Sequence, residues 1–347
     1  MKKLDRYVSS CFLSSYGVCL LFFVSMFVLI DLFAKTEELI GRADKVAKLG
    51  YSVAQTTLEY YGLMAPFIFL QVAPFVTVMA AIFAITRLRR TNEFVPMIAA
   101  GRSAFRILMP MFVFALVLGI GMVLVQQFIA PGLADRRERL KELLFSAKTE
   151  RLITQPFRPS EDVAVNVVDY DCDDHTIKFV DVSYLLSKEP SLTAENLTWD
   201  EGKQRFVYRK KGAPQDAPFE VLDVDLSPEI IEAQARGPHD LSYSQAEFVY
   251  GKTGQAKYKV LLHYHLTFPL SNVLLLLLGL PFVLRLEKRS LMVGMVIAIV
   301  ICASYFAFDA VMRNLGEKDA LHPVLAAWFG VIFFGSLGVV LIDGVKT

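Results

Sequence analysis

The segment from Val260 to Leu284 reads VLLHYHLTFPLSNVLLLLLGLPFVL and contains no Asp, Glu, Lys or Arg. A helix needs about 20 predominantly apolar residues to cross the hydrocarbon core of a bilayer, and this segment is longer than that. Ten of the residues from Val273 to Leu284 are Leu, Val or Phe, and each contributes roughly −0.3 to −0.6 kcal/mol toward insertion. The segment therefore predicts a membrane-spanning helix.

Five further windows also lack charged residues, and the shortest of the six holds 19 residues. They are Tyr7–Ile30, Tyr60–Thr86, Ile107–Ala134, Ser290–Phe308 and Ala320–Ile342. The whole chain is 54% apolar and 20% charged, whereas an average soluble domain is about 45–50% apolar and about 25% charged. These features exclude soluble, fibrous, disordered and disulfide-scaffold proteins. The net charge of +1 gives no general attraction to nucleic acid.

The six windows divide the chain into three parts. We expect transmembrane helices 1–3 in residues 1–134, a soluble domain in residues 135–259, and transmembrane helices 4–6 in residues 260–347. Arginine and lysine gather before the first window, in the 87–106 loop and after the fourth window, whereas the intervening short loops carry mixed charge. By the positive-inside rule, both termini face the cytoplasm and residues 135–259 face outward.

The middle segment opens with a charged helical pattern, and short β-rich runs follow it. These runs are Val163–Val168, Thr176–Val182, Arg205–Tyr208 and Phe219–Val224. Strands at this spacing, separated by turn residues, are typical of a sandwich or jelly roll. Ser227 and Pro228 then predict the start of a helix, with Ser227 as the N-cap, and Asp240 to Tyr243 predict another helix start. Cys172 is the one cysteine of this segment, so we expect no disulfide within it.

We find no catalytic or nucleotide-binding constellation in the sequence. Gly251-Lys252-Thr253 resembles the end of a phosphate-binding loop, but the first glycine of that pattern is replaced by Ala246. His263 and His265 point about 200° apart on a helix and cannot share a metal ion. Asp309 and Arg313, four residues apart, suggest a structural ion pair rather than a proton relay. We therefore predict a protein that is not an enzyme and binds no cofactor or metal ion itself.

Several motifs, taken in order, resemble the LptF/LptG permease family of lipopolysaccharide export. They are Leu4-Asp5-Arg6-Tyr7, Asn92 to Gly101 (NEFVPMIAAG), Asp225 to Glu229 (DLSPE), Asp240-Leu241-Ser242, His265 to Leu270 (HLTFPL), Leu280-Pro281-Phe282 and His322 to Trp328 (HPVLAAW). Each motif alone is weakly specific, but their order and the placement of a domain between two groups of three helices are strongly specific. The resemblance covers essentially the whole chain.

The resemblance implies a permease subunit of an ABC-type exporter in the bacterial inner membrane. Such subunits work as a pair of similar six-span chains, together with a dimer of the cytoplasmic ATPase subunit LptB. They extract lipopolysaccharide and pass it through periplasmic β-jellyroll domains to a bridge that begins with LptC. By this resemblance, residues 135–259 are a periplasmic jelly roll. Whether the partner is a paralogue or a second copy, whether this chain is F-like or G-like, and which glycolipid is carried stay open.

The resemblance also assigns ATPase coupling to the 87–106 loop. Glu93 matches the family's coupling-helix glutamate, Phe94 and Met97 would supply apolar contacts in a groove, and Arg89 and Arg90 belong to the same basic loop. Two positions depart from the family pattern, because Pro96 stands where a helix former is usual and Ala100 stands where a serine is usual. The alternative is an ordinary basic cytoplasmic loop.

A candidate site for lipid head groups follows the first span. If the helix continues beyond the membrane, Lys35, Arg42 and Lys45 lie within roughly 80° of one face, where they could bind lipid phosphates. Glu38 shares that face, and a solvated mixed-charge loop is the alternative. For the whole chain, the alternatives to a transporter are a non-transporting membrane scaffold or assembly protein of the same fold and a lipid-modifying enzyme.

Overall fold

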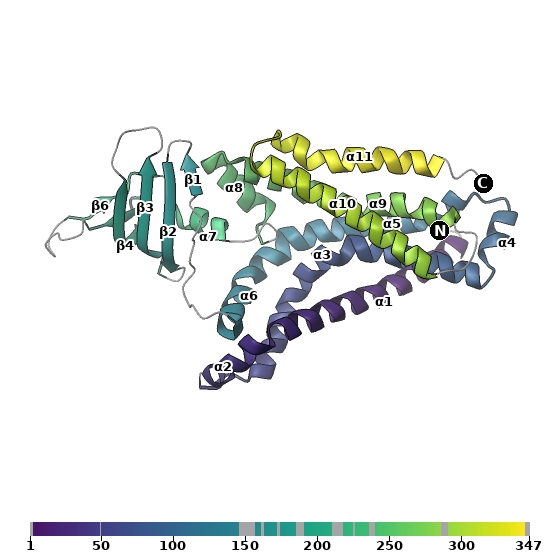
Figure 1. The fold of residues 1–347 in the computed structure, drawn as a ribbon, viewed down its shortest axis with the longest axis horizontal. Coiled ribbons are helices and arrows are strands. Elements are labelled where there is room, and N and C mark those ends of the chain that lie inside the picture. The colour runs from purple at the N-terminus through teal and green to yellow at the C-terminus, as the bar shows by residue number, and fades with distance from the viewer. Residues whose placement is uncertain are drawn as a thin grey trace.

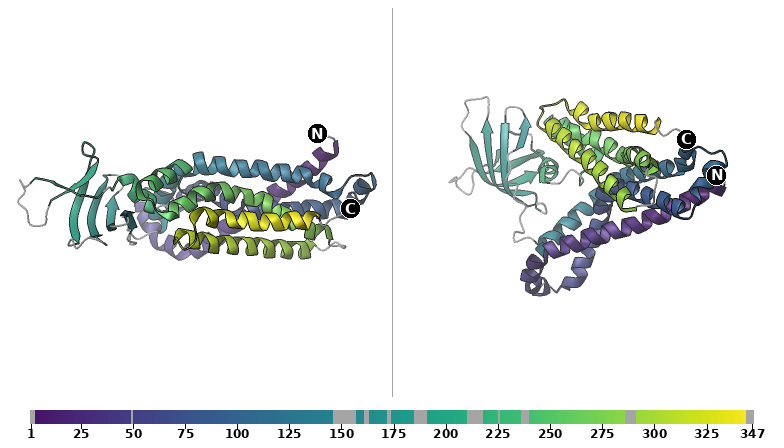
Figure 2. Two further views of the ribbon diagram at one scale, coloured as in Figure 1. Left: turned by 90° about the horizontal axis from the view of Figure 1, so that it is seen from above. Right: turned by 45° about the vertical axis from the view of Figure 1, so that its right-hand side comes forward.

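The computed structural model describes residues 3–48, 50–145, 157–160, 163–171, 174–184, 191–209, 218–224, 226–235, 240–285 and 291–343. A long bundle of helices carries an antiparallel sheet beyond one of its ends, and both chain termini lie at the opposite end (Figures 1 and 2). The helices are α1 (Lys3–Ala34), α2 (Thr36–Lys48), α3 (Val53–Arg90), α4 (Phe94–Ala99), α5 (Ala104–Leu124), the π-helix η1 (Val125–Ile129), α6 (Ala130–Phe145), α7 (Pro228–Ala235), α8 (Tyr243–Thr253), α9 (Ala256–Arg285), α10 (Leu291–Glu317) and α11 (Pro323–Asp343).

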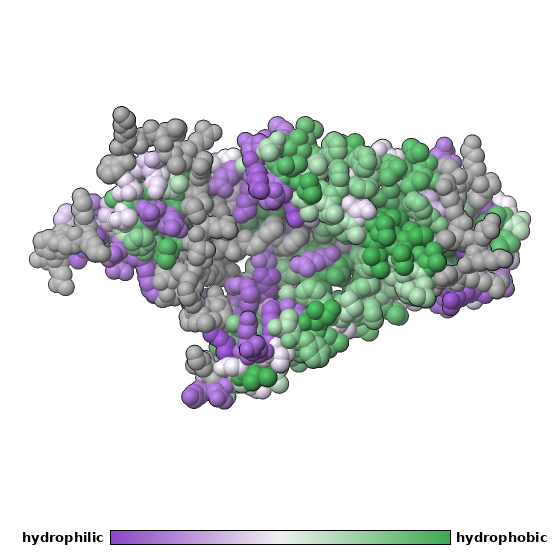
Figure 3. Space-filling view, viewed as in Figure 1, coloured by the Kyte–Doolittle hydropathy of each residue, from purple (hydrophilic) through white to green (hydrophobic). Residues whose placement is uncertain are grey.

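Six helical segments are long and apolar enough to cross a membrane, three before the strands and three after them. They are Lys3–Ala34, Val53–Arg90, Ala104–Ala134, Ala256–Leu284, Met292–Glu317 and Pro323–Asp343. Each contains most or all of one charge-free window of the sequence. On the face drawn in Figure 3, apolar side chains form a broad band over the helices, and polar side chains gather toward both ends of the bundle. This distribution is the one a lipid bilayer requires.

Helices α3 and α9 form the centre of the bundle. Within this chain, 72% of the most apolar window of each is buried, compared with 6% for α1 and 17% for α10. A polar contact joins the two central helices, because the hydroxyl of Thr77 donates to Oδ1 of Asn272 over 2.9 Å. Both side chains are fully buried, so each needs such a partner in an apolar surrounding. The sequence prediction of six spans located these helices but not their order of burial.

The strands form one six-stranded antiparallel sheet in the order β1-β2-β3-β4-β5-β6. They are β1 (Phe157–Ser160), β2 (Val163–Asp171), β3 (Thr176–Tyr184), β4 (Leu192–Asp200), β5 (Arg205–Tyr208) and β6 (Glu220–Val221). Strands that are neighbours in sequence are neighbours in the sheet, which is a meander. A jelly roll has two sheets joined by Greek-key connections, so the described strands differ from the predicted architecture. Ile230 and Ile231 of α7 are buried with the apolar side chains of the sheet.

Strand β4 was not predicted, because only three of its nine residues, Thr193, Thr198 and Trp199, are β-branched or aromatic, and its alternation of apolar residues also changes phase. Ala194 and Leu197 are both buried although they lie three residues apart, and Asn196 between them has a φ of +53°. The neighbouring strand β3 shows the same change, since Ile177 and Val180 are both buried. A strict period of two therefore does not describe these strands. The short edge strand β1 was also missed, and β6 covers only part of the predicted run Phe219–Val224.

The two predicted helix starts after the sheet have different outcomes. Helix α7 begins at Pro228 as predicted, but the hydroxyl of Ser227 is buried without a hydrogen-bond partner, so Ser227 does not cap the helix with its side chain. Ser242 does cap α8, because its hydroxyl accepts from the amide of Gln245 while the Gln245 side chain accepts from the amide of Ser242. This reciprocal pair is a capping box. Cys172 lies outside the described residues.

Candidate functional site

The predicted coupling loop is shorter than residues 87–106, because the flanking helices extend into it. Helix α3 continues to Arg90 and α5 begins at Ala104, with α4 between them. Asn92 and Gly101 bracket α4 with φ angles of +55° and +80°, a region that glycine and asparagine adopt most readily. Figure 1 shows α4 at the end of the bundle where both termini lie. The arginines in the last turn of α3 face the negative end of its dipole.

Arg89 holds α4 against the bundle. Its guanidinium donates to the carbonyl oxygens of Val283 (3.2 Å) and Leu284 (2.8 Å), at the end of α9. The same guanidinium lies 5.4 Å from the ring centre of Phe94, within the range of a cation–π contact. Arg89 is therefore a structural contact between α3, α4 and α9, whereas Arg90 beside it is exposed.

The apolar residues of α4 lie on two faces. Phe94 is buried in the main apolar cluster of the bundle, and Met97 is partly buried against the same cluster. Val95 is 70% exposed, and Pro96 and Ala99 of α4 are exposed as well. The apolar contact predicted for Phe94 and Met97 stays a prediction, and Val95 was not among the predicted residues. A helix of six residues gives too little periodicity to separate the two faces.

Glu93 precedes α4, and its carboxylate is incompletely satisfied. Its Oε2 is buried without a hydrogen-bond partner, while the Tyr7 side chain forms a hydrogen bond with the same carboxylate. The carboxylate makes no capping bond to α4, because the backbone of Glu93 is itself helical and Pro96 at the third helical position has no N–H. Polar atoms in this condition are uncommon in folded proteins.

The first turns of α1 contact both ends of the α4 loop. Tyr7 reaches Glu93 before α4, and Asp5 pairs with Arg102 after it, with 3.3 Å between Oδ1 and Nη1. Both residues belong to the motif Leu4-Asp5-Arg6-Tyr7. The sequence analysis used that motif only as a family signature, because residues almost 100 positions apart carry no local sign of contact.

Lys35 is held inside a cluster at the other end of α1. Its ammonium group pairs with Asp31 over 2.9 Å and lies 5.1 Å from the ring centre of Phe145. Tyr61 donates a second hydrogen bond to the same Asp31 oxygen. Burial alone would lower the pKa of Lys35, but the hydrogen bond to Asp31 and the contact with Tyr60 outweigh it, and the pKa is raised. The lysine charge is thus already paired.

The other two predicted head-group residues lie in α2. Arg42 is half-buried, and the side chain of Lys45 is not among those described. The predicted head-group site therefore stays a prediction for Arg42 and Lys45, and Lys35 has a structural role besides it.

The residues considered for nucleotide binding, metal binding and proton transfer lie in surroundings that do not form such sites. Gly251 to Thr253 end α8 instead of opening a helix, so they lack the context of a phosphate-binding loop. His265 contacts two backbone carbonyls, and His263 lies 3.4 Å from the indole nitrogen of Trp328. Arg313 forms its ion pair with Glu317, not with Asp309. Among the described residues, no three His, Cys, Asp or Glu side chains gather as a metal site would require.

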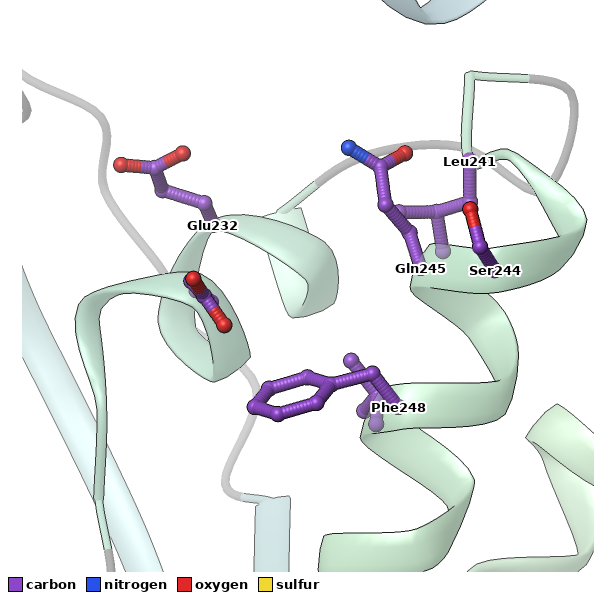
Figure 4. A pocket seen from close by; sticks show the side chains of 7 residues that line it. Glu232, Leu241, Ser244, Gln245 and Phe248 are labelled. Carbon is purple, nitrogen blue, oxygen red and sulfur yellow. The ribbon is translucent and has the colours of Figure 1, made fainter. Parts of the chain in front are cut away.

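A cavity of about 330 Å³ lies between α7 and α8, beside the sheet end of the bundle. Glu229 and Glu232 line it from α7, and Phe248 extends from α8 toward α7 (Figure 4). Leu241 and Val249 form its apolar side. The cavity marks a place where these two short helices do not pack closely against each other.

A comparison with protein families finds a match over nearly the whole chain. The family described as lipopolysaccharide export system permease LptF/LptG matches residues 6–343. The chain belongs to the LptF/LptG family. This result confirms the resemblance drawn from the motifs. LptF/LptG proteins are transport permeases, not a class of enzyme, and the six long apolar helices agree with a membrane permease. No match was found among curated proteins.

Proposed function

We propose that this LptF/LptG chain is one permease subunit of an ABC-type exporter that extracts lipopolysaccharide, or a related glycolipid, from the inner membrane. It works with a second six-span subunit, which is a paralogue or another copy, and with a dimer of an LptB-like ATPase. An LptC-like protein forms the periplasmic bridge that receives the lipid. ATP is bound by the ATPase, so this chain needs no cofactor of its own.

The observation that carries the proposal is the construction of α4. A carboxylate with an unsatisfied oxygen, Glu93, stands beside an exposed apolar side chain, Val95, on a short helix anchored from two sides. Glu93 as a whole is only half-buried, so a rotation of its side chain would bring this oxygen to a basic side chain of an ATPase subunit, and charge-assisted bonds of this kind are strong. Arg90 and Val95 are exposed next to it for further contacts.

The orientation in the membrane follows from the charges around α4. Arginines 87, 89, 90, 102 and 106 gather there, and the positive-inside rule places this end in the cytoplasm. The sheet lies beyond the opposite end (Figure 1) and would face the periplasm. The chain then divides into transmembrane helices 1–3 (1–134), a periplasmic domain (135–259) that completes a jelly roll with its partners, and transmembrane helices 4–6 (260–347).

The apolar surface of α1 supports a path for lipid and a second subunit. Only 6% of its most apolar window is buried within this chain. Large side chains including Leu21, Phe22 and Phe33 are exposed along it. Such a face must be covered by lipid chains or by an apolar partner helix.

The test is purification of the chain from its host membrane followed by reconstitution into proteoliposomes with the partners that co-purify. We expect an ATPase subunit to co-purify and ATP to drive release of lipopolysaccharide to a soluble acceptor bridge protein. Glu93→Gln should reduce retention of the ATPase about ten-fold, as expected when a charge-assisted contact worth about 1.4 kcal/mol is lost. Glu247→Gln, the same change on exposed α8, is the matched control.

The scaffold alternative makes the opposite prediction. If no ATPase subunit co-purifies and ATP releases no lipid from a folded, membrane-inserted chain, the transport proposal is wrong. If transport is normal but Glu93→Gln retains the ATPase as well as Glu247→Gln does, α4 is not the docking element.

A further inference from the structure

The segment Asp240–Tyr243 leads into α8. The helix bundle binds it through the side chain of Asp240 and through the backbone of Leu241 and Tyr243. Arg137 of α6 donates two parallel hydrogen bonds to Asp240, of 3.0 Å to Oδ1 and 2.9 Å to Oδ2. The side chain of Arg137 is 14% exposed and that of Asp240 is 13% exposed. Arg137 also lies 4.2 Å from the ring centre of Phe67 in α3. A two-pronged contact of this kind fixes orientation as well as distance.

Two further contacts hold the backbone of the same segment. Nε2 of His265 in α9 lies 3.0 Å from the carbonyl oxygen of Leu241, and Nδ1 lies 2.7 Å from that of Leu261. Carbonyl oxygens only accept, so the Nε2–H tautomer of the imidazole donates to Leu241. The amide of Tyr243 donates to Oε1 of Gln127 over 2.9 Å. Gln127 lies in the π-helix η1, and π-helical turns are frequent at functional sites. The segment is therefore held by α6 and η1, which precede the strands in the chain, and by α9, which follows them.

The apolar packing divides at the same place. Ile230 and Ile231 of α7 belong to the core of the sheet. Leu241 and Val249 instead pack with Tyr258 and Leu261 in the first turns of α9. The cavity of about 330 Å³ separates α7 from α8 (Figure 4). Helix α8 thus packs as part of the bundle, although the sequence division placed it with the outer domain. The boundary between the two apolar cores falls between α7 and α8.

We propose that Asp240–Tyr243 is a clasp that sets the position of the sheet on the bundle, and that Arg137, Gln127 and His265 are positioning residues for passage of lipid from the helices to the sheet. This inference rests on the proposed function. The clasp lies on the bundle side of this boundary, and α8, which follows it, contacts both α7 and β1. A lipid leaving the bundle for the sheet would cross the boundary beside the clasp. The clasp residues act after extraction, so their loss separates lipid transfer from ATP hydrolysis.

The test uses the full exporter complex in proteoliposomes with a photo-crosslinking amino acid at Tyr184, which is partly buried against the apolar core of the sheet. Arg137→Gln is expected to lower ATP-dependent capture of lipopolysaccharide about ten-fold, the lower range for loss of a group that positions another. ATP hydrolysis should change less than about two-fold, because α4 lies at the opposite end of the bundle. Arg136→Gln is the matched control, since Arg136 is the preceding residue, is 68% exposed and pairs with Glu59.

A second pair of variants covers the case in which Arg137→Gln does not fold. Gln127→Glu keeps an oxygen that accepts from the Tyr243 amide and should retain capture, whereas Gln127→Leu removes it and should lower capture. If Gln127→Leu and a folded Arg137→Gln both capture lipid at the wild-type level, the clasp is wrong. Equal losses of capture and ATP hydrolysis would also overturn it. If the wild-type complex shows no ATP-dependent capture, the proposed function itself fails, and the clasp with it.

Discussion

Lys35 and Glu93 are both partly buried charges, but their surroundings differ. Lys35 is paired with Asp31 and lies near the rings of Tyr60 and Phe145. Glu93 has an oxygen without a partner. The lysine therefore contributes to the fold of this chain, whereas the glutamate has an unused capacity to bind. A sequence alone does not distinguish the two cases, because both residues are single charges close to a predicted span.

Lys35→Met tests the structural role of the lysine. The change keeps most of the aliphatic stem but leaves Asp31 with Tyr61 and no cation, so we expect a loss of about 1–3 kcal/mol in stability. Thermal unfolding in detergent measures the effect, and Lys48→Met, an exposed lysine at the end of α2, is the control. Unchanged stability together with weaker lipopolysaccharide binding would favour the head-group role instead.

At the scale of elements, α4 combines an anchoring face with an exposed face. Phe94→Ala removes a buried ring from the bundle, and such truncations cost about 3–5 kcal/mol. Val95→Ala changes an exposed side chain and should leave stability unchanged, yet weaken ATPase retention by about ten-fold, the effect of a contact worth about 1.4 kcal/mol. Thermal unfolding and co-purification separate the two faces. Normal retention with Val95→Ala would show that the exposed face does not bind the ATPase.

The last turn of α10 packs closely against α9 and α11 at a glycine, Gly316. A Cβ at Gly316 would lie 2.5 Å from the Cβ of Ala326 and 2.9 Å from Cγ2 of Val260. Since the Cβ of Ala326 cannot rotate away, Gly316→Ala should destabilise the chain by about 1–3 kcal/mol. Gly121→Ala in α5 is the control, because a Cβ there meets nothing within 4 Å. Equal unfolding temperatures for the two variants would contradict the close packing.

At the scale of the whole molecule, the sheet and α4 lie at opposite ends of the bundle (Figure 1). In the proposed exporter, this separation would allow one chain to contact an ATPase at one end and a bridge protein at the other. The central helices α3 and α9 are the most buried of the six long apolar helices, and α1, α10 and α11 are less buried within this chain. The architecture therefore suits a subunit that connects two sides of a membrane.

Accessibility to a membrane-impermeant maleimide tests this orientation. In a background with the native cysteines replaced, Glu195→Cys on β4 should be labelled in cells whose outer membrane has been permeabilised. Arg90→Cys should be labelled only in inverted inner-membrane vesicles. Both positions are exposed in the chain, so burial does not explain a difference between them. Labelling of Arg90→Cys from the periplasmic side would reverse the proposed topology.

The sequence by itself determined the six apolar helices, the family and several of the strands. A helix long enough to span a bilayer is set by transfer free energies that add along a contiguous segment, so composition alone locates it. The runs at β2, β3 and β5 were visible because they are rich in β-branched and aromatic residues, which is a local property. Strand β4 has few such residues and changes phase at Asn196, so it was missed.

The tertiary structure decided how charges and small helices are used. Arg89 binds the end of α9, and Phe94 packs beside it. Lys35 pairs with Asp31 and lies near the ring of Phe145, so its charge is not free. Arg137 meets Asp240 across 103 positions of sequence, and no local pattern records such a pairing. Local free energies decide which segments enter a membrane, whereas a residue's role depends on neighbours that only the folded chain brings together.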